Sequence, residues 1–278
     1  MKSFENLKET QLHPFHSGDD ASWALWSQAY FDGIQAEMTM THDPAPVVDF
    51  ILSLISSKKR LFPETFSLID ACCGTGNLAN ALAREGIKTL GVDASSYCIN
   101  KARAQYARSH FARTMCEFVC SDVRVFHHEE PFDFLVNWHS SFAYSPADDE
   151  NLKMIEAFSR LLKPGAQWVL STYNPQDLRS HFQRYIVKHL QLPEGEMISI
   201  RESFLDGNIL SSHWEFLLPD GQRVYRSGLT KLYELSELIS LFGQHNMVIE
   251  HAFGSLNKEP YQFHSPALIL VGRKCHER

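Results

Sequence analysis

The sequence predicts an α/β protein with a doubly wound seven-stranded sheet, N-terminal helices and an inserted antiparallel β subdomain. An apolar run, Phe66–Ala71, leads into a glycine-bearing loop and then a helix, as a buried parallel strand does. Apolar runs and amphipathic helices then alternate in βαβ fashion. Farther on, Asp206-Gly207-Asn208 and Pro219-Asp220-Gly221 separate alternating segments, which is typical of antiparallel hairpins.

Composition and charge exclude several classes of protein. Of 278 residues, 44% are hydrophobic and 21% charged, which indicates a globular chain with a sizeable core. The 26 Lys and Arg against 33 Asp and Glu give a net charge of −7, which disfavours nucleic acid and membrane surfaces as partners. With no apolar run of ~18 residues and no secretory signal at the start, we expect a cytoplasmic protein.

Cysteine and histidine spacing predicts neither disulfides nor a metal site. The six cysteines form no C-x-x-C pair, so we expect reduced thiols. The 14 histidines show no H-x-x-x-H or H-E-x-x-H spacing. The sequence therefore predicts no metal.

The N-terminal part shows helical periodicity. Between Asp19 and Glu37, apolar side chains recur every three or four positions, at Trp23, Trp26, Tyr30 and Ile34. A second helix is expected after Pro46. We interpret residues 1–60 as a helical cap.

The central part gives the core. Strands are expected over Phe66–Ala71, Ile87–Val92, Cys116–Cys120, Phe132–Asn137 and Gln167–Thr172, and helices over Ser95–Arg108 and Asp148–Leu162. Lys163-Pro164-Gly165 is expected to end the second helix.

After Tyr173 the pattern changes. A helix is expected over Asp177–Leu190, followed by strands over Met197–Phe204, Ile209–Leu218 and Arg223–Leu229. The chain then returns to the first pattern, with a helix over Glu234–Gln244 and strands over Met247–Phe253 and Ala267–Gly272. We interpret residues 61–175 and 230–278 as the core, and residues 176–229 as an inserted antiparallel lid.

The loop Asp70-Ala71-Cys72-Cys73-Gly74-Thr75-Gly76 is typical of nucleotide binding. It follows a strand and opens a helix, so glycines allow a ligand to approach the backbone and the helix offers free N–H groups. Gly74-x-Gly76-x-x-Ala79 also fits the dinucleotide fingerprint, so the loop alone does not separate NAD from another adenosine cofactor.

Two carboxylates point to an adenosine. Asp93 ends the second strand, where a carboxylate can accept both ribose hydroxyls. Asp122 follows the third strand, where an acidic side chain can take the adenine amino group. The glycine loop, Asp93 and Asp122 all lie at the carboxyl ends of neighbouring strands, where an open α/β sheet binds its ligand.

These residues carry a resemblance to a known family. DACCGTGNLANALAREGIKTLGVDAS, CSDVRVF and FDFLVNWHSSFAYSPADDENLKMIEAFSRLLKPGAQWVLSTYN resemble, in order and spacing, the motifs of class I S-adenosylmethionine-dependent methyltransferases. These enzymes have a Rossmann-like fold. The chain is more narrowly similar to the bacterial small-molecule branch with an antiparallel insertion after strand five. The resemblance covers about Trp23 to Lys274 and implies S-adenosyl-L-methionine as the cofactor.

The resemblance also implies roles for individual residues. Asp70 and Gly74 would lie near the methionine part of the cofactor, Gly76 under the adenosine, and Asn137 beside the sulfonium. The other cofactor positions would be Asp93 at the ribose, Asp122 and Val123 at the adenine, and Tyr30 over the amino-acid end. Ala94, next to Asp93, is also a candidate cofactor-binding residue. The chain departs from the family pattern at Ala143 and Ala166, where glycine is usual, and at Gly243-Gln244-His245.

Methyl transfer by direct displacement depends on proximity and orientation, and a base is needed only where the acceptor must lose a proton. His139 is the first candidate for that base and Tyr144 the second, with a wall or packing role as the alternative for each. Trp138-His139-Ser140 replaces the [Asp/Asn]-Pro-Pro-aromatic run of enzymes acting on planar nitrogens, so an oxygen or nitrogen of another small molecule is expected. Two other functions stay open: an NAD-linked oxidoreductase, and a non-methylating module that binds adenosylmethionine.

Overall fold

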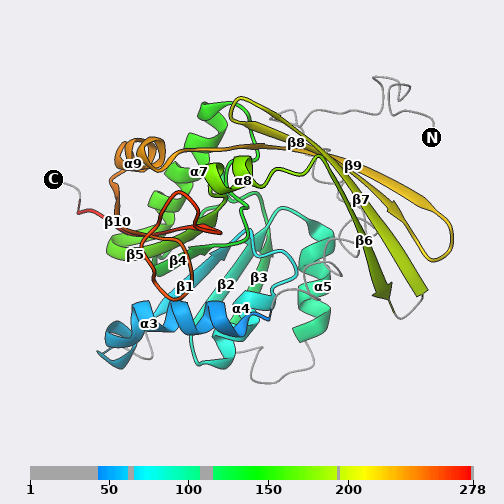
Figure 1. Cartoon of the computed structure of the whole chain (residues 1–278). Coiled ribbons are helices and arrows are strands. Elements are labelled where there is room, and N and C mark those ends of the chain that lie inside the picture. Colours follow the sequence, from blue (N-terminus) through cyan, green and yellow to red (C-terminus); the bar gives the residue numbers. More distant parts are fainter. Residues whose placement is uncertain (1–42, 62–65, 107–114, 193–194, 277–278) are drawn as a thin grey trace. The chain divides into compact units, whose positions relative to one another are not determined.

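A computed structural model describes residues 43–61, 66–106, 115–192 and 195–276 (Figure 1). The chain forms two compact units. The core unit comprises the described parts of Thr41–Ala143, Ala147–Phe182 and Leu232–Arg278. The hairpin unit contains Gln183–Lys231 together with Tyr144–Pro146. The expected helix over Asp19–Glu37, with Tyr30, lies outside the described residues.

The core unit contains a seven-stranded sheet of order β10-β11-β5-β4-β1-β2-β3, which confirms the predicted fold class. Strands β1 to β5 run parallel where they pair, and β11 runs antiparallel to both of its neighbours, β5 and β10. The strands are β1 (Ser67–Ala71), β2 (Lys88–Asp93), β3 (Cys116–Cys120), β4 (Phe132–Asn137), β5 (Leu162–Thr172), β10 (Met247–Phe253) and β11 (Leu268–Lys274). Strand β5 begins at Leu162 rather than Gln167, so Lys163-Pro164-Gly165 lies within it.

Helices cover both faces of this sheet because the buried strands are apolar on both sides. The helices are α3 (Ala45–Leu61), α4 (Asn77–Arg84), α5 (Ser96–Tyr106), α7 (Asp148–Leu161), α8 (Pro175–Ser180) and α9 (Leu235–Gly243). Along β4, Leu135 packs with α7 and α9, whereas Phe134 and Val136 pack on the opposite face with α3. Helix α3, expected within an N-terminal cap, therefore belongs to the core unit.

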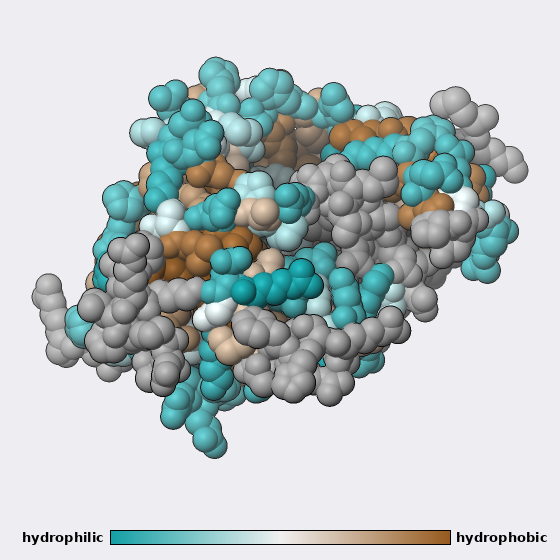
Figure 2. All heavy atoms as spheres, turned by 90° about the horizontal axis from the view of Figure 1, so that it is seen from below, coloured by the Kyte–Doolittle hydropathy of each residue, from teal (hydrophilic) through white to brown (hydrophobic). Residues whose placement is uncertain are grey.

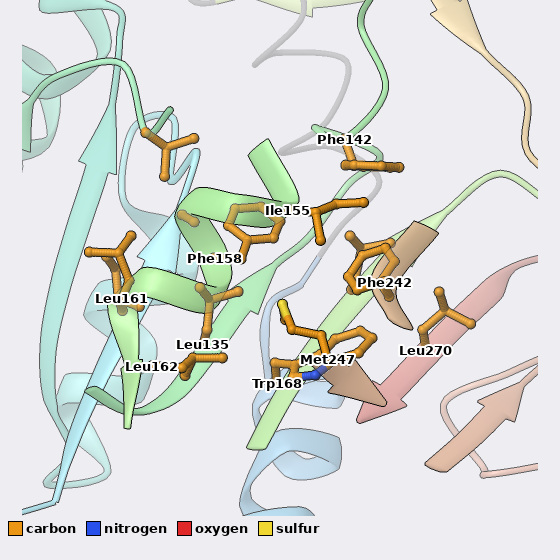
Figure 3. Packing of buried hydrophobic residues seen from close by; sticks show 14 of the residues in the cluster. Leu135, Phe142, Ile155, Phe158, Leu161, Leu162, Trp168, Phe242, Met247 and Leu270 are labelled. Carbon is orange, nitrogen blue, oxygen red and sulfur yellow. The ribbon is translucent and has the colours of Figure 1, made fainter. Parts of the chain in front are cut away.

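Aromatic packing fixes the α7/α9 face (Figure 3). Trp168 of β5 stacks on Phe242 of α9, with ring centroids 4.7 Å apart. Phe142, from the loop after β4, lies 5.9 Å from the same Phe242 ring. This loop is thus tied to the core at a fully buried residue.

The hairpin unit is a four-stranded antiparallel sheet of order β6-β7-β8-β9. Its strands are β6 (Tyr185–Leu192), β7 (Gly195–Asp206), β8 (Ile209–Leu217) and β9 (Arg223–Lys231), and both expected hairpin turns are present. The expected helix over Asp177–Leu190 is wrong. Helix α8 ends at Ser180, and β6 pairs along its whole length with β7, so cross-strand pairing overrides the helical interpretation. The expected role of this unit as a lid stays a prediction.

Polar side chains cover much of the described surface in Figure 2, with separate apolar areas between them. None of the described helices is long and apolar enough to cross a membrane. Within the same described residues, no group of three or more His, Cys, Asp or Glu side chains is arranged to hold a metal ion.

Candidate cofactor site

Three predicted site residues lie at the carboxyl ends of adjacent strands. Asp70 is next to last in β1, Asp93 ends β2 and Asn137 ends β4. Asp70 pairs in register with Gly91 of β2 and with Val136 of β4, so these strand ends form one continuous edge. An open α/β sheet binds its ligand at this edge.

The glycine loop folds back against β2. The backbone N–H groups of Cys72 and Cys73 both donate to the carbonyl of Val92, at 2.8 and 3.0 Å. Gly74 and Gly76 have positive φ angles of 56° and 74°, which favour glycine. The two glycines differ in their surroundings. A Cβ on Gly74 would meet nothing within 4 Å, whereas a Cβ on Gly76 would lie 2.3 Å from the Phe118 ring of β3.

Asp93 anchors the same loop. Its Oδ2 accepts the backbone N–H of Gly74 at 2.8 Å, and its Oδ1 accepts that of Ser95 at 2.9 Å. Burial raises the pKa of this carboxyl, and the two N–H bonds act against that rise. Each oxygen has a further lone pair, so the carboxylate is oriented and can still accept hydroxyl groups. Ala94, between Asp93 and Ser95, is half-buried.

Two buried acceptors at this edge have no hydrogen-bond partner among the described residues. They are Oδ2 of Asp70 and Oδ1 of Asn137. The amide of Asn137 is fixed, because its Nδ2 donates to the carbonyl of Ala71 at 2.8 Å. Burial, and then the charge of Asp93, raise the pKa of Asp70 to about 7. Unsatisfied buried acceptors are costly, and a cation that carries N–H donors would satisfy them.

Comparison with known proteins decides the class of this site. Residues 68–165 match the family described as a methyltransferase domain. That match spans the glycine loop, both strands that carry Asp93 and Asn137, and helix α7. Residues 68–165 are a methyltransferase domain. The match confirms the resemblance to the class I enzymes, and the cofactor that this domain implies is S-adenosylmethionine.

A curated relative gives a similar result over a longer segment. The chain is 28% identical over 170 residues to a ubiquinone biosynthesis O-methyltransferase of Alkalilimnicola ehrlichii. The matched segment is 60% of this chain and 63% of that enzyme, so the chain spans less than two thirds of its relative.

Solved structures show that the methyltransferase fold extends over most of the chain. An S-adenosylmethionine-dependent methyltransferase from Clostridium acetobutylicum has a TM-score of 0.72 at 17% identity, covering 92% of this chain and 100% of that one. The CcbJ methyltransferase from Streptomyces caelestis has a TM-score of 0.71 at 17% identity, covering 84% and 90%. The sugar N-methyltransferase KedS8 from Streptoalloteichus has a TM-score of 0.67 at 17% identity, covering 84% and 89%.

In the methyltransferase domain, Asp122 already has a strong partner. Arg124 donates to both carboxylate oxygens of Asp122, from Nε at 3.1 and 3.0 Å and from Nη2 at 2.5 Å. Nη1 of Arg124 also donates to Glu150 of α7 at 2.5 Å. The predicted contact of Asp122 with adenine therefore has to share this carboxylate with Arg124. Val123, the next residue, is buried.

The loop after β4 has an unusual backbone. His139, Ser140 and Ala143 have φ angles of 60°, 55° and 70°, although none is glycine. The backbone N–H of Ser140 donates to the carbonyl of Ser171 in β5 at 3.0 Å, which holds the loop in place. The left-handed angle at Ala143 explains why glycine is usual at this position.

The two candidate bases differ in their surroundings. The side chain of His139 is exposed at the edge of the core unit. Tyr144 is half-buried and falls in the hairpin unit, so the structure does not bring the two side chains together within one unit. Of the two candidate bases, His139 therefore lies in the core unit and Tyr144 in the hairpin unit.

Two residues with structural roles near the site were not predicted. Arg124 joins Asp122 to α7, and its only sequence signal is its place two residues after that carboxylate. Asn174 is buried just after β5. Asn137 ends β4 and Asn174 lies two residues after the end of β5, so both amides follow a buried strand to the same edge, and this similarity could have drawn attention to Asn174.

Proposed function

We propose that the chain transfers the methyl group of S-adenosylmethionine to an oxygen or nitrogen of a small-molecule acceptor by direct displacement. The observation that carries this proposal is the pair of buried acceptors, Asp70 Oδ2 and Asn137 Oδ1, beside a glycine loop whose Gly74 N–H is bound by Asp93. Adenosylmethionine has an ammonium group to donate there and a ribose for Asp93. NAD has no ammonium group for this position.

The residues of the chain act mainly by binding and orientation. When bound, the cofactor supplies a methyl group on a positively charged sulfur. Asp93 would accept the ribose hydroxyls, and Asp70 with Asn137 would accept the N–H donors of the methionine end. Fixing the cofactor at both ends leaves the methyl group in one place, and such positioning accounts for much of the rate in a displacement.

The names of the similar proteins support a small-molecule acceptor. They leave two choices for the atom that receives the methyl group, an oxygen or a nitrogen. The curated relative is named as an O-methyltransferase, and KedS8 as a sugar N-methyltransferase. The net charge of −7 argues against a polyanionic acceptor. We therefore propose a hydroxyl or an amine of a small metabolite.

His139 is the proposed general base for such an acceptor. It is exposed and lies two residues after Asn137, which ends β4 at the cofactor edge. An imidazole there can take the proton that a hydroxyl or an ammonium loses on methylation. Tyr144 remains the second candidate.

Calorimetric titration with S-adenosylhomocysteine and with NAD tests the cofactor. We expect binding of the first and none of the second, and the reverse result would overturn the proposal. Asp93→Ala should weaken S-adenosylhomocysteine binding by about ten- to a hundredfold, since buried hydroxyls lose their acceptor. Asp133→Ala is the matched control, because that carboxylate lies near the other end of β4 and pairs with Lys163. Its cofactor affinity should stay within about twofold.

Turnover of His139→Asn tests the base. Asn tolerates the left-handed backbone found at this position, so the variant removes the imidazole without adding strain. We expect turnover to fall at least about tenfold with cofactor affinity within about twofold. Unchanged turnover would show that His139 only lines the site. A loss of cofactor affinity as large as the loss of turnover would show that His139 contacts the cofactor.

A further inference from the structure

The order of strands sets the side from which an acceptor reaches the methyl group. On the proposed function, the ribose lies at Asp93 of β2 and the methionine end at Asp70 of β1 and Asn137 of β4. The adenosine therefore occupies the β2 and β3 side of the edge. In the sheet order, β5 and β11 lie on the other side of β4. We therefore place the acceptor on the side of the edge where β4 and β5 end and β11 begins.

Two segments meet at that end of β5. Thr172, the last residue of β5, pairs with Leu268, the first residue of β11. Because β5 and β11 are antiparallel, the residues after Thr172 and those before Leu268 lie at the same edge as Asn137. These segments are Tyr173-Asn174 and the turn 261–266.

The side chain of Asn174 locks the two segments together. It is 2% exposed, and its Nδ2 donates to the carbonyls of Gln262, Phe263 and Ser265, at 3.3, 3.0 and 2.7 Å. Its Oδ1 accepts from the Tyr261 hydroxyl at 2.8 Å.

The same Oδ1 also accepts the backbone N–H of Gln176 at 3.0 Å, which caps α8. The turn also has one bond to a strand, because the backbone N–H of Tyr261 donates to the carbonyl of Ala252 in β10 at 3.0 Å. The buried amide of Asn174 adds the bonds that join this turn to the end of β5.

Each of the two segments that Asn174 joins carries an exposed aromatic side chain. Phe263 is 53% exposed and Tyr173 is 39% exposed, although both rings belong to segments fixed by Asn174. The His264 ring meets Phe263 edge-on, with centroids 4.6 Å apart. Rigid, exposed aromatic rings are suited to contact a flat or apolar ligand surface at a low cost in conformational entropy.

We propose that Phe263 and Tyr173 form the acceptor-contacting wall of the enzyme, selecting a small molecule with an apolar ring face, and that Asn174 is the positioning residue for this wall. The ring can be aromatic or the C–H face of a sugar, since both present an apolar surface to an aromatic side chain. The wall confers acceptor affinity and leaves cofactor binding unchanged.

Saturation-transfer NMR on the S-adenosylhomocysteine-bound protein tests the wall. The two ring probes are catechol, for an aromatic acceptor, and glucosamine, for an amino sugar. We expect one probe to receive saturation from wild-type protein and to lose most of it in Phe263→Ala and Tyr173→Ala. Phe263→Tyr should retain the signal. Loss confined to catechol identifies an aromatic ring, and loss confined to glucosamine identifies a sugar.

Ile239→Ala is the matched control, because Ile239 is also 53% exposed but lies on α9. Two results would overturn the proposal. One is that neither probe receives saturation from the wild-type protein, and the other is that Phe263→Ala and Ile239→Ala give equal signals. Asn174→Ala should speed hydrogen exchange of the backbone amides within 261–265 and weaken the same probe signal. Intact exchange protection would remove its positioning role.

S-adenosylhomocysteine affinity, measured separately by calorimetry, distinguishes the two proposals. It should stay within about twofold in Phe263→Ala, Tyr173→Ala and Ile239→Ala. No binding of S-adenosylhomocysteine to wild-type protein would overturn the proposed function. Binding of S-adenosylhomocysteine without a Phe263-dependent probe signal would overturn the wall alone.

Discussion

Asp70 is the residue whose chemistry depends most on its surroundings. It is 2% exposed, Asp93 lies close enough to repel its charge, and its Oδ2 has no hydrogen-bond partner among the described residues. With a pKa of about 7, this carboxyl is largely protonated at slightly acidic pH in the cofactor-free protein. A ligand that brings positive charge favours the ionised form.

Cofactor binding should therefore release a proton. At pH 6, the ammonium of S-adenosylhomocysteine would displace the proton that Asp70 holds, whereas at pH 8.5 Asp70 is already ionised. We expect affinity to rise with pH up to about 7 and then to level off. Calorimetry in two buffers of different ionisation enthalpy measures the protons released. Asp70→Asn is the control, and the prediction is wrong if wild type and this variant release equal numbers at pH 6.

The same carboxyl should lower the stability of the cofactor-free protein at alkaline pH. Its folded pKa of about 7 lies above the unfolded value near 3.8, so the unfolded chain loses its proton first as pH rises. The cost is absent below the unfolded pKa, grows between the two values and is complete above about 7. Asp70→Asn should raise Tm by about 2–6 °C at pH 8 and by much less at pH 4.5. Thermal unfolding at both pH values checks this, and an equal shift at both would contradict it.

Among the elements, the start of α4 depends on Gly76 for two reasons, its backbone conformation and the close packing around it. Gly76 needs a left-handed backbone, and Phe118 of β3 fills the space where a Cβ would stand. The Phe118 ring also stacks on Tyr106 of α5 at 5.7 Å, so it has little freedom to move. Helix α4, strand β3 and helix α5 thus meet at one backbone position.

Alanine at Gly76 and at Gly74 separates these two constraints. Both substitutions incur the left-handed penalty of roughly 1–2 kcal/mol, since both φ angles are positive. Gly76→Ala should cost about 1–3 kcal/mol more, because its methyl would overlap Phe118. Chemical denaturation measures the difference. Phe118→Leu in the Gly76→Ala background should recover part of it, and equal losses for both alanine variants would show that packing has no part.

The sequence predicted those elements whose burial is regular. The strands Cys116–Cys120 and Phe132–Asn137 have the expected bounds, because each is a short apolar or alternating run. Strand β6 was mistaken for a helix because most of its residues are exposed or half-buried, so its sequence shows little periodicity and its pairing with β7 decides the structure.

The site divides in the same way. Asp93 and Asn137 were predictable, because each ends a buried strand at the ligand edge. The Arg124 link from Asp122 to Glu150 was not, because it joins residues 28 positions apart that only the folded chain brings together. The hydrogen bonds from Asn174 to the turn 261–266 could not be predicted either, because the partners of Asn174 follow almost 90 residues later in the chain.

For the whole molecule, the strand latest in the described chain is an interior strand of the sheet. Leu268, Ile269, Leu270 and Val271 of β11 are all buried, and β5 and β10 flank them. The side chains of Leu270 and Val271 enter the two opposite hydrophobic clusters, which lie on the two faces of the sheet. Both faces of the core therefore depend on this one strand.

A charge in β11 should unfold the core unit. Val271→Asp buries an unpaired carboxylate at a residue that is 1% exposed, and we expect a loss of about 3–5 kcal/mol of stability. Val248→Asp, on the neighbouring β10 at 46% exposure, is the matched control and should cost less than about 1 kcal/mol. Circular dichroism during urea unfolding compares them, and similar midpoints would contradict the dependence on β11.

The place of β11 also sets the order of events during synthesis on a ribosome. Until Leu268–Lys274 has emerged, β5 and β10 each lack a hydrogen-bonding neighbour on the side that β11 later fills. After β10 has emerged and before β11 follows, a nascent chain thus carries both open backbone edges, and such edges invite pairing with other chains. Strand β11 covers both edges once it has emerged, and until then they are the kind of surface that chaperones for exposed strands can shield.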